Sequence, residues 1–149
     1  MNEVLSKSTA KYKIVFGHYP LYASGNHLTQ AKDALSLLKL RELLEPILKE
    51  HQVDLYLAGH EHMYERTEPI DGVTHVVSGA AGKVRKKKLL KETDYPRAHV
   101  QSTLHFMFFQ LADNGLIFEA LDDKLKPLEA APTVLLPKKA SGTQLDIVA

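Results

Sequence analysis

The order of hydrophobic and polar positions predicts a strand, a long helix and a second strand in the first part of the chain. Residues 12–16 form a short apolar run that stops at Gly17, which is typical of a buried strand entering a loop. From about Thr29, apolar residues recur at helical spacing and charged residues fill the other positions, which predicts an amphipathic helix. Pro46 falls inside this pattern, so we expect a kink or a break near residues 44–45.

A second apolar run, at residues 53–58, completes a βαβ unit. Crossovers of this kind are right-handed and make the two strands parallel, so the loops after both strands open at the same edge of the sheet. Ligand sites in open α/β sheets lie beyond the carboxyl ends of such strands. The pattern therefore predicts an α/β fold in which His18, His60 and His62 lie close together.

The second half of the chain has the pattern of antiparallel strands joined by tight turns. Residues 70–73 resemble a hairpin turn that leads into a strand at residues 73–78. A second hairpin is predicted from apolar runs at residues 105–111 and 116–121, which flank Asp113-Asn114-Gly115.

One domain is the expectation for 149 residues. Beyond Lys126, three prolines and a Ser-Gly pair interrupt a segment without a clear period. We therefore expect residues 1–126 to belong to the folded domain and residues 127–149 to be an extended or poorly ordered tail.

Composition narrows the functions that the chain can have. A formal net charge of +1 argues against nucleic acid as the main partner, because nucleic-acid binding requires a strongly basic face. No apolar run approaches the roughly 20 residues that cross a bilayer, so no membrane partner is expected. The absence of cysteine leaves histidine, carboxylate, amide and tyrosine as the available metal ligands.

Gly59-His60-Glu61-His62 is the clearest candidate for metal chemistry. Two neutral imidazoles on one short loop can bind metal at low entropic cost. A His-x-His sequence alone is more often a pair of surface or core histidines than a ligand pair. Its position directly after an apolar strand, together with the strand-end residue His18, favours the ligand interpretation.

Residues 13–22 and 53–66 closely resemble two signature blocks of the purple acid phosphatases, within the calcineurin-like metallophosphoesterase superfamily. The resemblance continues through residues 77–82 and the last hairpin. It implies the C-terminal half of a calcineurin-like sandwich, with a βαβ unit followed by mainly antiparallel strands. It also implies hydrolysis of phosphate monoesters.

The same resemblance implies a centre of two metal ions. In it, His18 and His60 bind one divalent ion, which is Fe, Zn or Mn, and His62 binds the other, usually Fe(III). A dimetal centre can clamp a phosphate ester and stabilise both the attacking and the leaving oxygen. His27 stands where similar enzymes place a histidine that binds substrate phosphate or protonates the leaving group. Tyr64 and Arg66 are expected to hydrogen-bond and pack behind the histidine loop.

Several ligands of such a centre have no counterpart before His18, namely an Asp on the first strand, a Gly-Asp-x-x-Tyr block and a Gly-Asn-His-Asp/Glu block. Three neutral histidines cannot offset the charge of two metal ions, so we expect weak or absent metal binding by this chain alone. The chain is expected to be a piece of a longer enzyme. One chain of a two-chain enzyme and a noncatalytic remnant are the alternatives.

The expected partners are a phosphate ester substrate and the N-terminal half of the domain, either in cis or as a second chain. The alternative function is a noncatalytic fragment or binding module that associates through an exposed sheet edge. An extracellular or periplasmic location is implied only by the resemblance.

Overall fold

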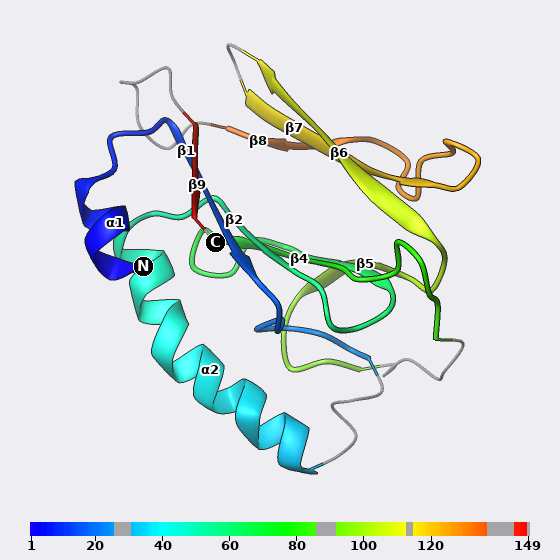
Figure 1. The fold of residues 1–149 in the computed structure, drawn as a ribbon, viewed down its shortest axis with the longest axis horizontal. Helices are drawn as coiled ribbons and strands as arrows, with labels where there is room; N and C mark the ends of the chain where they lie inside the picture. Colours follow the sequence, from blue (N-terminus) through cyan, green and yellow to red (C-terminus); the bar gives the residue numbers. More distant parts are fainter. Residues whose placement is uncertain (26–30, 86–91, 113–114, 137–144, 149) are drawn as a thin grey trace.

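The computed structural model describes residues 1–25, 31–85, 92–112, 115–136 and 145–148. Two sheets lie face to face, and a long helix covers the outer face of the larger one (Figure 1). The larger sheet has the order β5-β3-β4-β2-β1-β9 and the smaller has the order β6-β7-β8. The helices are α1 (Asn2–Lys7) and α2 (Ala31–Glu50). The strands are β1 (Tyr12–Gly17), β2 (Leu55–Ala58), β3 (Tyr64–Thr67), β4 (Thr74–Ser78), β5 (Arg97–Gln101), β6 (His105–Ala112), β7 (Gly115–Asp122), β8 (Thr133–Leu135) and β9 (Leu145–Val148).

The predicted βαβ unit is confirmed. Strands β1 and β2 are parallel neighbours, with Gly17 opposite Ala58 at their carboxyl ends. Helix α2 connects them, and β4 continues the parallel pairing on the far side of β2. The loops that carry His18 and His60 therefore leave adjacent strands at one edge of the sheet.

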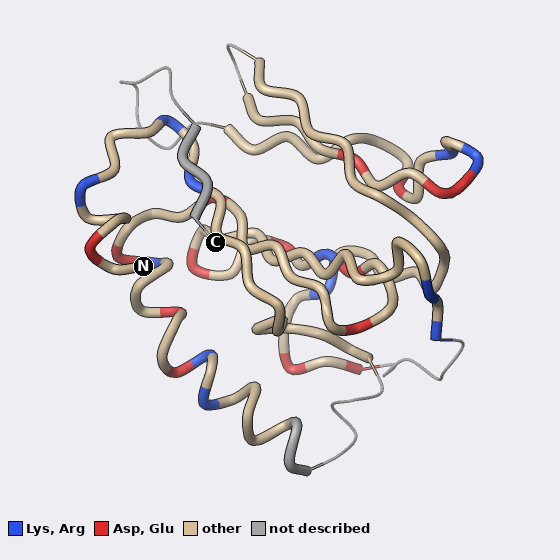
Figure 2. Tube along the Cα trace, viewed as in Figure 1, with Lys and Arg blue, Asp and Glu red and all other residues tan. Residues whose placement is uncertain are grey.

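Helix α2 is a single helix, so the predicted break near residues 44–45 is wrong. Pro46 lies on the exposed side, where water can bond the carbonyl that a proline leaves without its usual partner. Leu44 and Ile47 pack against the core on either side of it, and Leu48 is fully buried. Packing thus holds the helix together across the proline. Acidic and basic residues both occur along α2 (Figure 2).

Both predicted hairpins are present. Ile70 and Val73 exchange backbone hydrogen bonds of 2.9 Å, and Asp71 and Gly72 between them have φ values of 48° and 81°. Two positive φ angles define the type of turn that matches the twist of antiparallel strands. The later hairpin pairs β6 with β7 from His105–Asp122 to Ala112–Gly115, and the two residues between these strands lie outside the described residues.

The segment after Lys126 contributes two strands. Strand β8 pairs with β7 in the smaller sheet, and β9 pairs in parallel with β1 at the edge of the larger sheet. Among the described residues, no helix has the length and apolar character needed to cross a membrane.

Two hydrophobic clusters hold the layers together. The first lies between α2 and the larger sheet and includes Val15, Leu48 and Tyr56. The second lies between the sheets and includes Tyr64 and Phe118, which are each at most 1% exposed. Burial of apolar surface on both faces of one sheet is the stabilising arrangement of a layered α/β fold. The structure is therefore the mixed α/β sandwich expected from the sequence.

Candidate metal centre

Close contacts between the two strand-end loops fix the position of the candidate site. The backbone N–H of Gly59 donates to the carbonyl of His18 at 3.2 Å. The hydroxyl of Tyr56 donates to the carbonyl of Tyr19 at 2.9 Å. A Cβ on Gly17 would lie 2.0 Å from that hydroxyl, so only glycine allows the bond. The β1 loop is therefore tied to β2 on both sides of Tyr19.

His18 and His60 are brought together at this edge. Nε2 of His18 lies 3.3 Å from Nδ1 of His60, and the ring centroids are 5.2 Å apart. The ring of Tyr19 lies 4.5 Å from that of His60. His60 has φ 63°, in the left-handed region that non-glycine residues rarely adopt. The tight turn after β2 is thus made by the histidine itself, and its ring lies against that of His18.

The separation of the two nitrogens fits a shared ion. Zinc–imidazole bonds of about 2.0–2.1 Å in tetrahedral geometry place two ligand nitrogens about 3.3–3.4 Å apart. The 3.3 Å between His18 and His60 agrees with that value. Among the described residues, however, no three His, Asp or Glu side chains gather closely enough to hold one ion. The pair therefore fits as two ligands of an ion whose remaining ligands lie elsewhere.

The structure does not bring His62 into this pair. His62 is half-buried, and its carbonyl accepts from the backbone N–H of Arg85 at 3.4 Å. Between the two histidines, Glu61 is only 4% exposed and lies against Gly25, where an added Cβ would be 2.1 Å from the carboxylate. Gly79 meets the other side of the loop, because its Cβ would lie 2.2 Å from the Glu61 carbonyl.

A hydrogen bond between Ser78 and His105 lies next to Gly79, behind the histidine loop. His105 is buried, and its Nε2 lies 3.0 Å from the hydroxyl of Ser78. Its Nδ1 lies 3.0 Å from the carbonyl of Thr103. A ring nitrogen can bond a carbonyl only as a donor, so Nδ1 carries the hydrogen and Nε2 accepts from Ser78. Burial lowers the pKa of His105, which favours this neutral form.

Tyr64 and Arg66 both bond Glu129, which follows β7 and lies beside the smaller sheet. The hydroxyl of Tyr64 donates to Glu129 Oε1 at 2.6 Å, and the guanidinium of Arg66 donates to Glu129 Oε2 at 2.6 Å. Burial, together with the neighbouring carboxylate, raises the pKa of Tyr64. These two side chains thus join the two sheets.

Glu65 lies between them on β3 and continues the same stretch of family resemblance, in which it is expected to hydrogen-bond and pack behind the histidine loop. It is 1% exposed and accepts from the backbone N–H and the hydroxyl of Ser24 at 2.7 and 2.8 Å. The hydroxyl of Tyr95 donates to its other oxygen at 2.6 Å. Alternation along β3 could have indicated that Glu65 faces the layer opposite to Tyr64 and Arg66. Glu65 fixes the end of the loop that carries His18.

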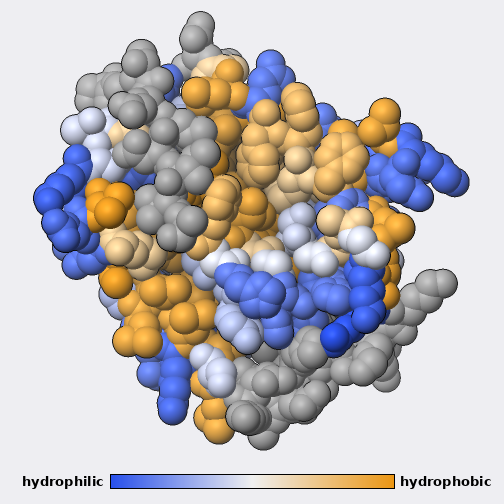
Figure 3. Space-filling model, viewed as in Figure 1, coloured by the Kyte–Doolittle hydropathy of each residue, from blue (hydrophilic) through white to orange (hydrophobic). Residues whose placement is uncertain are grey.

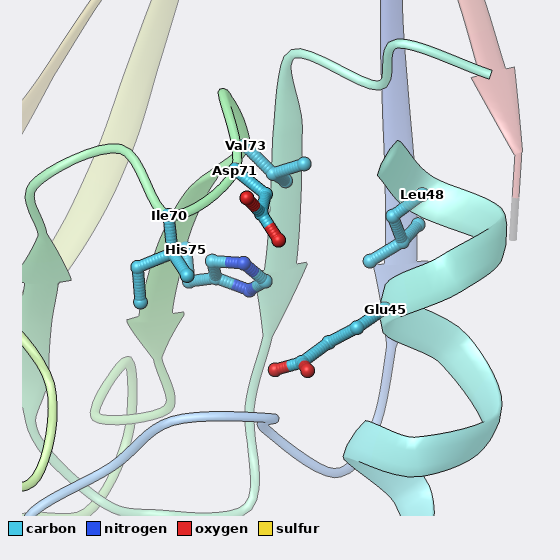
Figure 4. Close-up of a pocket in the computed structure, with 6 residues that line it drawn as sticks. All are labelled: Glu45, Leu48, Ile70, Asp71, Val73 and His75. Carbon is cyan, nitrogen blue, oxygen red and sulfur yellow. The ribbon is translucent and has the colours of Figure 1, made fainter. Parts of the chain in front are cut away.

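His27 lies outside the described residues. His75, on β4, is 4% exposed and lines a small cavity of about 10 Å³ with Glu45 and Asp71 (Figure 4). In this view its ring lies between the two carboxylates. Burial, and to a lesser degree the charge of Arg41, lowers the pKa of His75 to about 3.

Residues 1–64 match the family model of the calcineurin-like phosphoesterases. Purple acid phosphatase 3 of Arabidopsis thaliana is 33% identical over 87 residues, which are 58% of this chain and 22% of that protein. Glideosome-associated protein 50 of Plasmodium falciparum is 28% identical over 120 residues, which are 80% of this chain and 28% of that protein. Residues 1–64 are therefore similar to the calcineurin-like phosphoesterases, and a longer part of the chain is similar to purple acid phosphatase 3 and to glideosome-associated protein 50.

Two solved structures share the fold. GAP50, described as the anchor in the inner membrane complex of Plasmodium, matches with a TM-score of 0.70 and 26% identity over 96% of this chain and 41% of that chain. Purple acid phosphatase PPD1 from yellow lupin (Lupinus luteus) seeds matches with a TM-score of 0.70 and 16% identity over 99% of this chain and 27% of that chain. The chain spans about a quarter of the length of the curated relatives described above.

Proposed function

We propose that this chain contributes His18 and His60 to one metal ion of a phosphomonoester hydrolase with a dimetal centre. The 3.3 Å between their ring nitrogens, at the edge where β1 and β2 end, is the observation that supports it. When bound, such ions supply Lewis-acid chemistry for hydrolysis of a phosphate ester. His62 is proposed as a ligand of the second ion. The divalent ion is proposed to be Fe, Zn or Mn, and the second ion Fe(III).

Residues around the two histidines hold their loops in place in this proposal. The hydrogen bond from Gly59 to His18 holds the two loops in register, and Tyr19 packs against both imidazole rings. Glu65 holds the loop after His18 through Ser24. These contacts orient the ring nitrogens before an ion binds, which reduces the entropic cost of binding. His27 is proposed to contact the substrate phosphate.

Titration with ZnCl₂, monitored through the histidine ring resonances in NMR spectra, tests the metal site. We expect zinc to shift the resonances of His18 and His60 with weak affinity, and expect His18→Ala or His60→Ala to remove the response. His51→Ala is the matched control, because His51 lies at the end of α2 and bonds Asn2. Unchanged zinc affinity in both site variants would contradict the proposal.

Turnover of a chromogenic phosphate ester tests the reaction separately. It is measured for the chain alone and together with a polypeptide that supplies the remaining ligand blocks of a purple acid phosphatase. We expect activity only in the second case, lost after His60→Ala or His62→Ala. Activity that survives both changes would exclude these residues from the site.

The similarity to GAP50 supports a second candidate, a noncatalytic binding module. The proposed contact is a sheet edge, and β5 forms one edge of the larger sheet. A partner captured by the chain and lost after Val100→Pro would support this candidate, since proline removes a backbone donor from the strand. Hydrolytic activity of the completed site would count against it.

A further inference from the structure

Strand β6 forms one edge of the smaller sheet and lacks the features that usually protect such an edge. Within the described part of the chain, its eight residues pair with β7 alone. Edge strands in natural proteins are usually short or carry charged residues or proline, because their open backbone groups otherwise attract another strand. Residues 105–112 contain no lysine, arginine, aspartate, glutamate or proline.

The other strand edges that the structure describes differ from β6 in these respects. The opposite edge of the smaller sheet is β8, which has only three residues. The larger sheet ends in β5, which includes Arg97, and in β9, which has four residues and includes Asp146. Strand β6 is therefore the long, uncharged edge among them.

One hydrogen bond shows which backbone groups of β6 face this edge. The backbone N–H of His105 donates to the carbonyl of Ala80 at 3.3 Å, and thus points away from β7. The direction of the backbone groups alternates from each residue of a strand to the next. The N–H and carbonyl groups of Met107, Phe109 and Leu111 therefore also point away from β7, toward the edge of the sheet.

The side chains beside this edge are apolar and accessible. Phe106, Phe108 and Leu111 are 43%, 51% and 48% exposed. Figure 3 shows hydrophobic surface in the upper part of the view, where Figure 1 places β6 and β7. An aromatic side chain can bury about 150–250 Å², so these residues leave roughly a few hundred Å² of apolar surface in water. A formal net charge of +1 gives little repulsion between two copies of the chain.

We infer that β6 pairs in antiparallel orientation with β6 of a second copy of this chain, about a two-fold axis at Phe109. A two-fold axis brings the same surface of both copies together, and two identical strands related in this way are antiparallel. In this register Phe109 faces its own counterpart and Met107 faces Leu111, so every edge-facing position named above is paired. Phe108 lies opposite Gln110, and no like charges meet. The pairing joins two smaller sheets into one and does not depend on the metal centre.

A contact through one strand predicts a weak dimer. Stable interfaces bury about 800 Å² per partner, which exceeds what one strand and its neighbouring rings supply. We expect a dissociation constant on the order of 10–100 μM. Sedimentation velocity of the whole chain, from about 1 to 1,000 μM, should show the mass rising from one chain to two. A single-chain mass throughout, or growth beyond two chains, would overturn the inference, because two-fold pairing closes after two copies.

Amide hydrogen exchange tests the register without any substitution. At concentrations that favour the dimer, we expect the amides of Met107, Phe109 and Leu111 to exchange about tenfold more slowly than in dilute solution. The amides of Phe108 and Gln110 point toward β7, so their protection should not depend on concentration. The same concentration dependence at both sets of positions would contradict pairing through this edge.

Two lysine substitutions distinguish pairing of edges from stacking of faces. Phe108→Lys places a charge beside the edge and should weaken the dimer at least about tenfold. Val134→Lys is the matched control, because Val134 is also 51% exposed but lies on β8 at the opposite edge of the same sheet. We expect the control to keep the dimer. Equal loss in both variants would show that sheet faces stack, and would overturn the inference.

Leu111→Pro tests the backbone contact directly. Proline removes a donor that faces the edge and leaves the hydrogen bonds between β6 and β7 in place. We expect this variant to sediment as a single chain over the same concentration range. A dimer that survives both Phe108→Lys and Leu111→Pro would exclude β6 as the contact.

Discussion

His60 shows how one residue carries both the candidate chemistry and a conformational cost. Its φ of 63° turns the chain directly after β2 and places Nδ1 near His18. A side chain in the left-handed region costs about 1 kcal/mol or more, which persists only where the surroundings enforce it. Such positions cluster at functional sites, and here the strained residue is itself the candidate ligand.

Two substitutions at His60 distinguish the energetic cost of its positive φ from the effect of removing its imidazole ring. Both His60→Ala and His60→Gly remove the imidazole, but only glycine adopts positive φ without strain. We therefore expect His60→Gly to be more stable than His60→Ala by about 1 kcal/mol in urea unfolding. Equal stability of the two variants would show that the loop relaxes when the ring is lost.

The buried ring of His75 predicts a loss of stability in acid. Its folded-state pKa of about 3 lies below the ordinary value of 6.5, so below pH 6.5 the unfolded chain binds a proton that the folded chain does not. Stability due to this group is therefore present above pH 6.5 and lost as the pH falls toward 3, by about 1.4 kcal/mol per pH unit at most. Urea unfolding from pH 7 to 4 should show a smaller decline for His75→Gln. His51→Gln, at the end of α2 and outside the core, is the comparison variant.

At the scale of elements, the strand-end loops are held by close packing of backbone against backbone. Gly79, directly after β4, contacts both Glu61 and Gly59 of the histidine loop. Ser78 before it is held by His105 from the smaller sheet. The position of the candidate ligands thus depends on three strands.

Gly79→Ala tests this dependence. Its Cβ would lie 2.2 Å from the Glu61 carbonyl, so the histidine loop must shift. We expect a loss of about 1–3 kcal/mol in unfolding free energy and a change in the His60 ring resonances. Gly82→Ala is the matched control, since nothing lies within 4 Å of its added Cβ. Similar effects of the two substitutions would contradict the proposed packing role.

Periodicity and turn chemistry were sufficient to predict the elements that carry the candidate site. The apolar runs before His18 and His60 and the Asp71-Gly72 turn are local patterns, and each appears as expected. The uninterrupted helix across Pro46 could not be predicted, because packing of residues on both sides decides it. Nor could the sequence show that His60 and not Gly59 takes the left-handed conformation, since that depends on the contact with the β1 loop.

At the scale of the whole molecule, Arg66 and Glu129 connect the two sheets. Their ion pair of 2.6 Å has side chains only 16% and 15% exposed, and Tyr64 donates to the same carboxylate. Burial disfavours the charged form of Glu129 and would raise its pKa. The hydrogen bonds from Arg66 and Tyr64 have the larger combined effect and hold the pKa of Glu129 below its ordinary value. Removal of one partner of such a pair leaves a poorly compensated charge.

Glu129→Gln should therefore destabilise the fold by about 1–3 kcal/mol in urea unfolding at pH 7. Glu3→Gln is the comparison, because it breaks the Lys7–Glu3 pair whose side chains are 74% and 81% exposed. We expect that change to cost less than about 0.5 kcal/mol. A cost for Glu129→Gln as small as that for Glu3→Gln would show that the sheets are held by apolar contact alone.

The pairing of β1 also has a kinetic consequence. Ile14 pairs with Leu55 on one side and with Ile147 on the other, which are 41 and 133 residues away along the chain. Bringing such distant segments together costs chain entropy before the paired strands contribute any stabilising contacts. Folds dominated by contacts between distant residues therefore form slowly. His18 and His60 meet only when β1 has joined β2. The candidate ligand pair is therefore absent from any early folding intermediate in which only the local β6–β7 hairpin has formed.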